Sequence, residues 1–402
     1  MRRSPWEVFL IFLGLGLKSF GGPMAHFVVF HREFVQRRAW IEEKQFGHLL
    51  TVCQLLPGPG SSQLGFSIGL LCAGWRGALA AFAGFTAPSA LLMFVFALAL
   101  PHLSGNLGVQ VLHGLKLVAL TVVAFGLFGM LRTLCPDWRR RAIAFASAAL
   151  VLCLANAWIS TLAIGLSALA GFAWCRKPGA TGDGASVALP TGIPRRGAMV
   201  LLLVYAILLV GLWLVSHDLA TQADPLAVIN AFYRAGALAF GGGHVVLPLL
   251  QDTVVAPGWI TRSDFLAGYG AAQAVPGPMY SLAAFLGADL PGLDSLAARG
   301  AGAAIGVMAI FLPGFLLVAG VVPMWQAWSQ NRGVAAAVAG ASAGVAGLLA
   351  AALYDPVWIS AVQAPRDGMI AGTAILILSR WRNASLAIVA FCVIASLAWN
   401  GL

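Results

Sequence analysis

The chain has 402 residues, of which 60% are hydrophobic and 9% are charged, and its mean hydropathy is +0.88. This composition excludes a water-soluble domain and predicts a protein with many membrane segments. The net charge is +10, but the arginines and lysines gather in a few short loops, which the positive-inside rule explains better than nucleic-acid binding does. The six cysteines have neither CxxC nor metal-ligand spacing, and we interpret them as small core residues.

The apolar segments, taken in chain order, fall into two groups of six. A helix that crosses a bilayer needs about twenty apolar residues. In the first half the segments are 6–30, 46–72, 77–100, 111–131, 142–157 and 158–175. In the second half they are 226–250, 264–289, 299–322, 333–353, 369–379 and 384–401, and segment 197–217 joins the two halves. We therefore predict an all-α, multi-pass membrane protein with one domain at 1–175, a linker and connecting helix at 176–225, and a second domain at 226–402.

Counting the crossings predicts that the two halves are inverted. Each half contributes an even number of segments and one segment joins them, so the second half enters the membrane from the opposite side. Loop charges agree with this arrangement. The side predicted to be cytoplasmic carries Arg2, Arg3, Arg132, Arg139, Arg140, Arg141, Arg176, Lys177, Arg195, Arg196, Arg380 and Arg382. The other side carries Asp218, Asp224, Asp289, Asp294, Asp355 and Asp367, with Arg299 and Arg366 as exceptions.

The charged stretch from His31 to Lys44 leaves one choice open. A strict count of crossings puts it outside, despite its basic residues. If segments 6–30 and 46–72 are instead re-entrant hairpins, the stretch stays inside. Both arrangements preserve the inverted repeat, because each pair contributes an even number of crossings.

One motif occurs in both halves. Phe20-Gly21-Gly22 is followed by Trp40, Phe46, Gln54 and Pro57-Gly58-Pro59. Phe240-Gly241-Gly242 is followed by Trp259, Phe265, Gln273 and Pro276-Gly277-Pro278. The spacings agree to within one residue, and both copies lie in apolar stretches. Interrupted helices inside a membrane face protein or a watery cavity, so the FGG and PGP motifs predict broken or re-entrant helices along a solute pathway.

The residues after each PGP turn suit an anion. A helix that restarts after Pro59 exposes backbone N–H groups at the positive end of its dipole, and two hydroxyls lie beside them. These groups belong to Gly60, Ser61, Ser62 and Gln63, with Met279, Tyr280 and Ser281 as the second copy. The glycines of the FGG motifs allow the close backbone approach of an opposing wall. The alternative is that both motifs serve tight helix packing, which two copies in register make less favoured.

Lys18 and Lys116 are charged residues inside predicted membrane segments. An unpaired ammonium costs about 2.5–3.5 kcal/mol at the centre of a membrane helix, so each is a functional candidate. Lys18 lies one turn before the first FGG break and is expected to face a cavity, whereas Lys116 is near a helix start and can instead snorkel. No acidic residue of the first half is placed to neutralise either lysine, so we expect a multivalent anion as their partner.

Paired histidines and glutamines flank the motifs. His26 and His244 follow the FGG breaks and offer a link to a coupling proton, with a structural role as the alternative. Gln54 and Gln273 precede the PGP turns. They can donate to a substrate or cap backbone carbonyls, and we favour the structural role. The predicted substrate-binding residues are Lys18, Ser19, Gly21, Gly22, His26, Gln54, Gly58, Gly60, Ser61, Ser62, Lys116, Gly241, Gly242, His244, Gln273, Gly277 and Ser281.

The sequence contains no enzyme signature. HExxH, a Walker loop, a GxSxG elbow and a nucleotide-binding module are all missing from it. We therefore expect neither catalysis nor a cofactor, and predict a secondary transporter driven by an ion gradient or by exchange.

Several of these stretches closely resemble the chromate ion transporter family. They are LKSFGGPMAHF, RRAW and CQLLPGPGSSQL in the first half, and LAFGGGHVVLP, GWI and AQAVPGPMY in the second. The resemblance covers nearly the whole chain. It implies a two-domain protein of the bacterial cytoplasmic membrane that exports chromate, with sulfate as the related tetrahedral dianion, and that confers chromate resistance.

Individual residues carry over from the family by position. Its motif positions are occupied by Gly21, Gly22, Pro23, His26, Trp40, Pro57, Gly58, Pro59 and Ser62 in the first half, and by Gly241, Gly242, Pro276, Gly277 and Pro278 in the second. The second half has Leu238 and Gly243 where the first has Lys18 and Pro23. This asymmetry implies that the first half binds the anion and the second mainly completes the scaffold.

Three other functions stay open at this stage. A membrane-embedded chromate reductase would need a redox cofactor, for which the sequence has no motif. An anion channel would have a continuous pore, and a sulfate or other oxyanion carrier would share the same motif chemistry. The sequence also leaves open the direction of transport, the coupling ion and the oligomeric state, a homodimer included.

Overall fold

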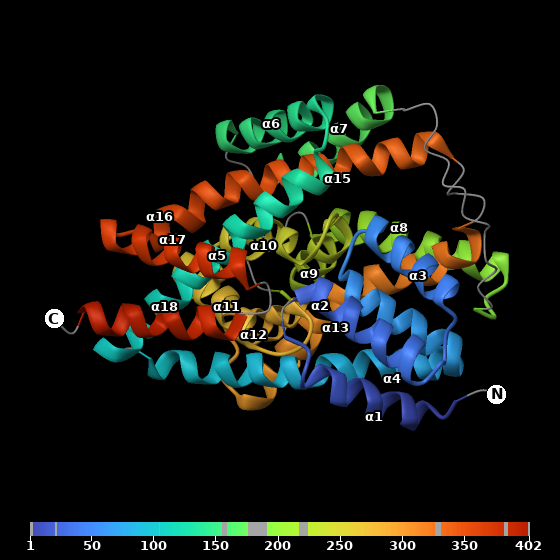
Figure 1. Ribbon diagram of the computed structural model, residues 1–402, viewed down its shortest axis with the longest axis horizontal. Helices are drawn as coiled ribbons and strands as arrows, with labels where there is room; N and C mark the ends of the chain where they lie inside the picture. Colours follow the sequence, from blue (N-terminus) through green and yellow to red (C-terminus); the bar gives the residue numbers. More distant parts are fainter. Residues whose placement is uncertain are drawn as a thin grey trace.

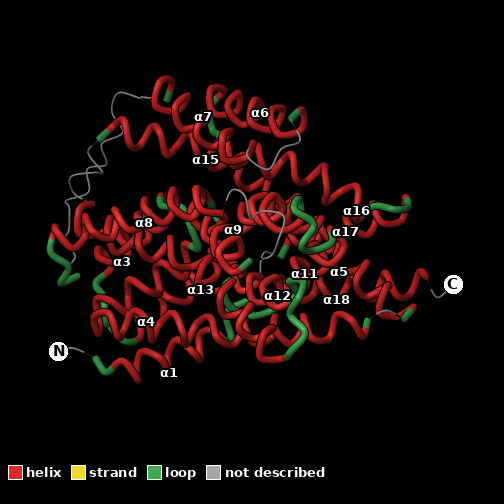
Figure 2. Tube along the Cα trace, turned by 180° about the vertical axis from the view of Figure 1, so that it is seen from behind, coloured by secondary structure: helices red, strands yellow, loops and turns green. Residues whose placement is uncertain are grey.

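The computed structural model describes residues 3–20, 22–103, 105–154, 159–175, 191–216, 224–325, 331–381 and 385–400. Within these ranges all regular structure is helical and no strand occurs (Figure 1, Figure 2). The all-α prediction is therefore confirmed for the described chain. Several predictions fall on undescribed residues, namely those for Gly21, most of the linker 176–196, Arg2, Arg176, Lys177, Asp218 and Arg382.

The first half consists of three short helices followed by longer ones. Its helices are α1 (Pro5–Gly16), α2 (Gly22–His31), α3 (Glu43–Leu55), α4 (Gly60–Ala99), α5 (Asn106–Leu134), α6 (Trp138–Cys153) and α7 (Ile159–Trp174). Between α2 and α3 runs a π-helical turn, η1 (Arg32–Arg37), and a 3₁₀ turn, η2 (Leu100–His102), follows α4. Ala73 and Gly74 depart from helical geometry and divide α4 into two arms, at the boundary predicted between segments 46–72 and 77–100.

Helix α8 (Arg195–Ser216) leads to a second half with the same order of elements. The helices are α9 (Pro225–Leu238), α10 (Val246–Leu250), α11 (Arg262–Ala274), α12 (Leu282–Ala288), α13 (Leu296–Val321), α15 (Arg332–Ala352), α16 (Ile359–Ala361), α17 (Pro365–Arg380) and α18 (Ser385–Asn400). The short turns are η3 (Gly243–Val245), η4 (Gln251–Val255), η5 (Met279–Ser281), η6 (Val322–Met324) and η7 (Leu353–Trp358). Even the π-helical turn recurs, because η4 follows α10 as η1 follows α2.

Five described helices are long and apolar enough to cross a membrane. They are Gly60–His102, Asn106–Leu134, Arg195–Val215, Leu296–Met324 and Arg332–Ala361. In helix α8 only 6% of the apolar window is buried within the protein, although the helix packs along α9 and α13, so most of its residues keep some surface for lipid. The protein is therefore a multi-pass membrane protein. Helix α1, with 12 residues, is about 18 Å long and cannot alone span a hydrocarbon core of about 30 Å.

The two halves interlock by exchanging their last hairpins. The α6–α7 hairpin of the first half packs on α15 of the second, and the α17–α18 hairpin of the second packs on α5 of the first (Figure 1). Small residues allow this close approach: Gly171 of α7 and Gly340 of α15 lie backbone to backbone. The halves therefore share one apolar core.

A hydrogen-bonded pair of a histidine and an aspartate fastens one of these exchanged contacts. His113 Nε2 on α5 lies 3.0 Å from Asp367 Oδ1 in the first turn of α17. The other carboxylate oxygen accepts the N–H groups of Gln363 and Ala364, each at 2.9 Å. Burial alone would raise the pKa of Asp367, but these hydrogen bonds outweigh it and hold the pKa below its ordinary value.

Replacing Asp367 by asparagine is expected to lower the free energy of unfolding by about 2–3 kcal/mol, because a charged acceptor of several hydrogen bonds is lost. The carboxylate's contribution is complete above the unfolded pKa of about 3.9 and is lost as pH falls through the lower folded pKa. Thermal unfolding in detergent at several pH values measures both effects. Asp294→Asn on an exposed loop is the control and should change little; equal melting temperatures for the two variants would contradict the role of the pair.

Candidate functional site

The helices break at both PGP motifs because proline cannot donate a backbone hydrogen bond and the central glycine takes a conformation that side chains disfavour. Helix α3 ends at Leu55 and α4 begins at Gly60. Helix α11 ends at Ala274 and η5 begins at Met279. The central glycines have φ angles of 117° at Gly58 and 107° at Gly277.

The FGG motifs interrupt their helices in a related way. Helix α1 ends at Gly16 and α2 begins at Gly22, whose φ is 77°. Helix α9 ends at Leu238, and Gly241 and Gly242 have φ angles of 93° and 128°. A Cβ on Gly22 or Gly242 would meet no atom within 4 Å, whereas one on Gly241 would strike Leu134. Two of these glycines therefore border open space.

Each PGP turn is hydrogen-bonded to the FGG break of the other half. The N–H of Gly58 donates to the carbonyl of Ala239, the residue before Phe240, at 2.9 Å. The N–H of Gly277 donates to the carbonyl of Ser19, the residue before Phe20, at 2.8 Å. We call this reciprocal pair of hydrogen bonds the clasp. It makes the four motifs one site, and it occupies the amides of Gly58 and Gly277, which would have to leave the clasp to meet a substrate.

His26 ties the first half of the clasp together. Its Nε2 lies 3.2 Å from the carbonyl oxygen of Ser19 and its Nδ1 lies 3.1 Å from Ser61 Oγ. The ring is buried edge-on to Phe85, with centroids 5.1 Å apart. Since a carbonyl can only accept, Nε2 carries a proton and donates to Ser19, and Nδ1 shares a second hydrogen bond with the hydroxyl of Ser61. His26 thus positions Ser61 at the start of α4.

Several polar atoms around the clasp have no hydrogen-bond partner among the described residues although they are buried. They are Ser19 Oγ, Ser62 Oγ, Gln63 Oε1, Thr86 Oγ1 and Tyr280 Oη. An unsatisfied buried polar group costs about 1–3 kcal/mol, so native structures keep few of them without a purpose. The four hydroxyls among them therefore have an unused capacity to donate a hydrogen bond.

The family of the chain follows from comparison with known sequences. The sequence model described as "Chromate transporter" matches residues 6–172 and again residues 226–397. The chain belongs to the chromate transporter family. The two matches fall on the two halves that carry the duplicated motifs.

Relatives extend over most of the chain. A chromate transport protein of Pseudomonas aeruginosa is 28% identical over 98% of this chain and 91% of its own length. A probable chromate transport protein of Synechococcus elongatus is 27% identical over 85% of this chain and 82% of its own, and a chromate transport protein of Cupriavidus metallidurans is 24% identical over 94% and 89%. No solved structure matches the chain.

The two lysines predicted inside membrane segments lie in different surroundings. Lys18 is exposed, next to Ser19 of the clasp. Lys116 is half-buried on α5 within electrostatic range of Asp264, in the first turn of α11. The second half therefore supplies an acid that the first half lacks. Asp264 precedes the end of α11 at Ala274 by ten residues, or about 15 Å.

The remaining predicted residues of the second half are held by their own neighbours. His244 Nδ1 lies 2.9 Å from the hydroxyl of Tyr269, and Gln273 Nε2 lies 2.9 Å from the sulfur of Met279. Ser281 is buried in η5. In the first half, Gln54 is exposed on α3, apart from the buried PGP turn. The structure thus gathers Ser19, His26, Gly58, Ser61 and Ser62 of the first half around the clasp.

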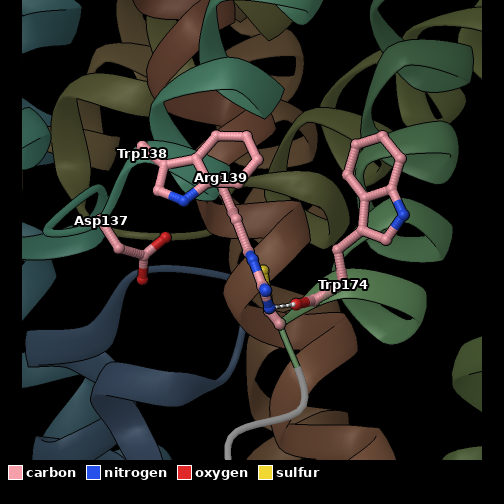
Figure 3. Close-up of a pocket in the computed structure, with 5 residues that line it drawn as sticks. Asp137, Trp138, Arg139 and Trp174 are labelled. Carbon is pink, nitrogen blue, oxygen red and sulfur yellow. Dashed lines mark hydrogen bonds between the residues drawn. The ribbon is translucent and has the colours of Figure 1, made fainter.

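A cavity of about 280 Å³ lies elsewhere, at the open end of the α6–α7 hairpin (Figure 3). Its lining residues are Asp137, Trp138, Arg139, Trp174 and Cys175. The guanidinium of Arg139 donates to the carbonyl of Trp174 at 2.7 Å, which closes the base of the hairpin. The cavity therefore belongs to the hairpin's end and is separate from the clasp.

Proposed function

We propose that this protein is a secondary active transporter that exports chromate across the bacterial cytoplasmic membrane and so confers chromate resistance. The observation that carries the proposal is the clasp, in which the broken helices of each half bind the breaks of the other. Such breaks, buried and surrounded by unpartnered hydroxyls, are the recurrent construction of binding sites in transporters built from inverted repeats. We take the two halves to be inverted in this way.

In this proposal the dianion binds at the start of α4. The N–H groups of Gly60, Ser61 and Ser62 stand at the positive end of the helix, where no intrahelical acceptor exists for them. The hydroxyl of Ser62 donates as well, and the charge of Lys18 attracts the anion into the break. The glycines at FGG positions give the backbone space to approach it, and opening of the clasp exposes the site to one side of the membrane at a time.

Sulfate is the second candidate substrate, because it is a tetrahedral dianion of the same charge and hydrogen-bonding pattern. The unpartnered donors around the clasp are all hydroxyls and amides, which do not distinguish the two ions by chemistry. A competition experiment therefore measures the preference between the two ions. Excess sulfate is expected to reduce chromate flux. Chromate flux that is unchanged by excess sulfate would show a site selective for chromate.

Lys18→Ala is expected to lower chromate flux by about tenfold or more, a loss of about 1.4 kcal/mol or more in dianion attraction, without a matching loss of folded protein. Uptake of radiolabelled chromate by everted membrane vesicles measures the flux. The control is Lys44→Ala, which removes the same charge from an exposed position outside the motifs. Unchanged flux in Lys18→Ala would remove the lysine from the site, and vesicles without chromate flux would remove the proposed function.

A further inference from the structure

The FGG break of the second half has a charged residue on each of its two arms. Arg234 lies on α9, six residues before Phe240, and Asp252 lies in the π-helical turn η4, twelve residues after it. Both side chains are half-buried, and the charge of Arg234 acts on the Asp252 carboxylate. Charged groups at such positions are costly and mark functional pathways in membrane proteins.

Both charged groups also contact the start of α7. Arg234 Nη2 donates to Thr161 Oγ1 at 2.7 Å. The hydroxyl of the neighbouring Ser160, itself buried, lies in hydrogen-bonding range of the Asp252 carboxylate. The second carboxylate oxygen, Oδ2, is buried and has no hydrogen-bond partner among the described residues. One oxygen of the Asp252 carboxylate therefore has a hydrogen-bond donor within range, and the other oxygen has none among the described residues.

The elements packed against η4 bring few other charges to Asp252. Helix α9 contributes Arg234, and the five residues of α10 are all apolar. Helix α11 contributes Arg262, which pairs with Asp355, and Asp264, which bonds Thr261. Helix α7 contributes only hydroxyls, those of Ser160 and Thr161. Among the charged residues of these elements, Arg234 is therefore the one whose charge acts on Asp252.

A buried carboxylate with an open oxygen is relieved by a proton, which removes the charge and turns that oxygen into a donor. Neutral Asp252 no longer attracts Arg234 across the FGG break. The angle between α9, which carries Arg234, and η4, which carries Asp252, can then change. The arm that carries Arg234 ends at Ala239, whose carbonyl accepts the N–H of Gly58. Only five residues of α9, from Arg234 to Leu238, separate this ion contact from Ala239. A movement of α9 at the break therefore also moves the carbonyl that the clasp uses.

We propose that Asp252 is the proton-binding residue of this transporter, and that its protonation, by releasing Arg234, loosens the second FGG break and opens the clasp. The inference rests on the proposed transport function. It gives the second half a task of its own, namely coupling, while the first half holds the anion.

The first half provides a matched control. Glu33 lies in the corresponding turn η1, and both acids precede the paired tryptophans, Trp40 and Trp259, by seven residues. Glu33, however, bonds Arg37 and Arg38 on its own side of the break. Its charge does not hold two arms together, so its neutralisation should leave the clasp as it is.

The test uses the purified full chain in liposomes, with initial rates of chromate flux measured at equal pH and under a gradient of about one pH unit, or about tenfold in proton activity. The wild type and Glu33→Gln are expected to change rate several-fold under the gradient. Asp252→Asn is expected to keep chromate–chromate exchange at equal pH and to lose the response to the gradient.

Two outcomes overturn the inference while the transport function stands: a gradient response that persists in Asp252→Asn, or a wild type that moves chromate without any response. A wild type that moves no chromate removes the proposed function itself. If Asp252→Asn does not fold, Asp252→Glu replaces it, because the longer side chain keeps a carboxyl group in a changed setting. It is expected to keep the response with a shifted half-maximal pH, and an unshifted half-maximal pH also overturns the inference.

Discussion

Replacing Gly58 or Gly277 by alanine is expected to abolish chromate flux and to lower the melting temperature. Both residues have a φ that a side chain rarely adopts, at a cost of about 1–2 kcal/mol. A Cβ on Gly58 would also lie 3.2 Å from Gly314 Cα, and one on Gly277 would lie 2.9 Å from Ser89 Oγ. Overpacking of this kind costs about 1–3 kcal/mol more. The amide of each glycine donates one of the two hydrogen bonds of the clasp. A shift of either turn therefore breaks a contact between the halves.

The measurement compares chromate flux in liposomes with thermal unfolding of the same preparations. Gly14→Ala is the matched control: Gly14 lies inside α1, and a Cβ there would meet no atom within 4 Å. This change should leave flux unaltered and add up to about 1 kcal/mol of helix stability. The clasp as a functional pair would be refuted by a folded variant at either PGP glycine that transports like the wild type.

The sequence alone predicts where the helices break, because that information is local. Proline and glycine at 57–59 and 276–278 remove donors and require positive φ angles, and both breaks occur there. The pairing of Gly58 with Ala239 joins residues far apart in the chain, and no local spacing encodes it. For the same reason the sequence could not show that the charge of Asp264 acts on Lys116.

Other features of the site were missed for different reasons. Thr86 lies within an apolar segment, and nothing in its neighbours distinguishes it from a residue that serves helix packing. Arg234 did carry a signal, since it is a charged residue inside the apolar segment 226–250, by the same criterion that selected Lys18. The nearly equal spacing of the duplicated motifs drew attention to residues that have a counterpart, and Arg234 has none.

The clasp also explains how two similar halves can have different tasks. Its hydrogen bonds are symmetric, but the residues behind them differ: Gly60, Ser61 and Ser62 follow the first PGP turn, where Met279, Tyr280 and Ser281 follow the second. The residues after the first turn are small, whereas Met279 and Tyr280 after the second are bulky; of these five residues only Gly60 is partly exposed. This difference favours a single anion site, at the start of α4.

Replacing Ser62 by alanine is expected to lower chromate flux by about tenfold or more while the protein keeps or slightly gains stability. The hydroxyl of Ser62 is buried and has no described partner, so its removal costs no hydrogen bond in the protein. A donor to a dianion, in contrast, is worth about 1.5–3 kcal/mol, which is roughly tenfold or more in affinity. Loss of function without loss of stability separates a ligand donor from a packing residue.

Ser281 occupies the corresponding position after the second PGP turn and provides the comparison. Ser281→Ala is expected to leave chromate flux within about twofold of the wild type, since a change of that size lies well below one hydrogen bond to a charged group. Flux and thermal unfolding are measured for both variants in parallel. Equal losses of flux would place an anion donor in each half, and a lower melting temperature in Ser62→Ala would mean that the hydroxyl bonds the protein. Only the unequal result, with a stable Ser62→Ala whose flux is strongly lowered and a Ser281→Ala close to the wild type, is compatible with a single dianion site at the start of α4.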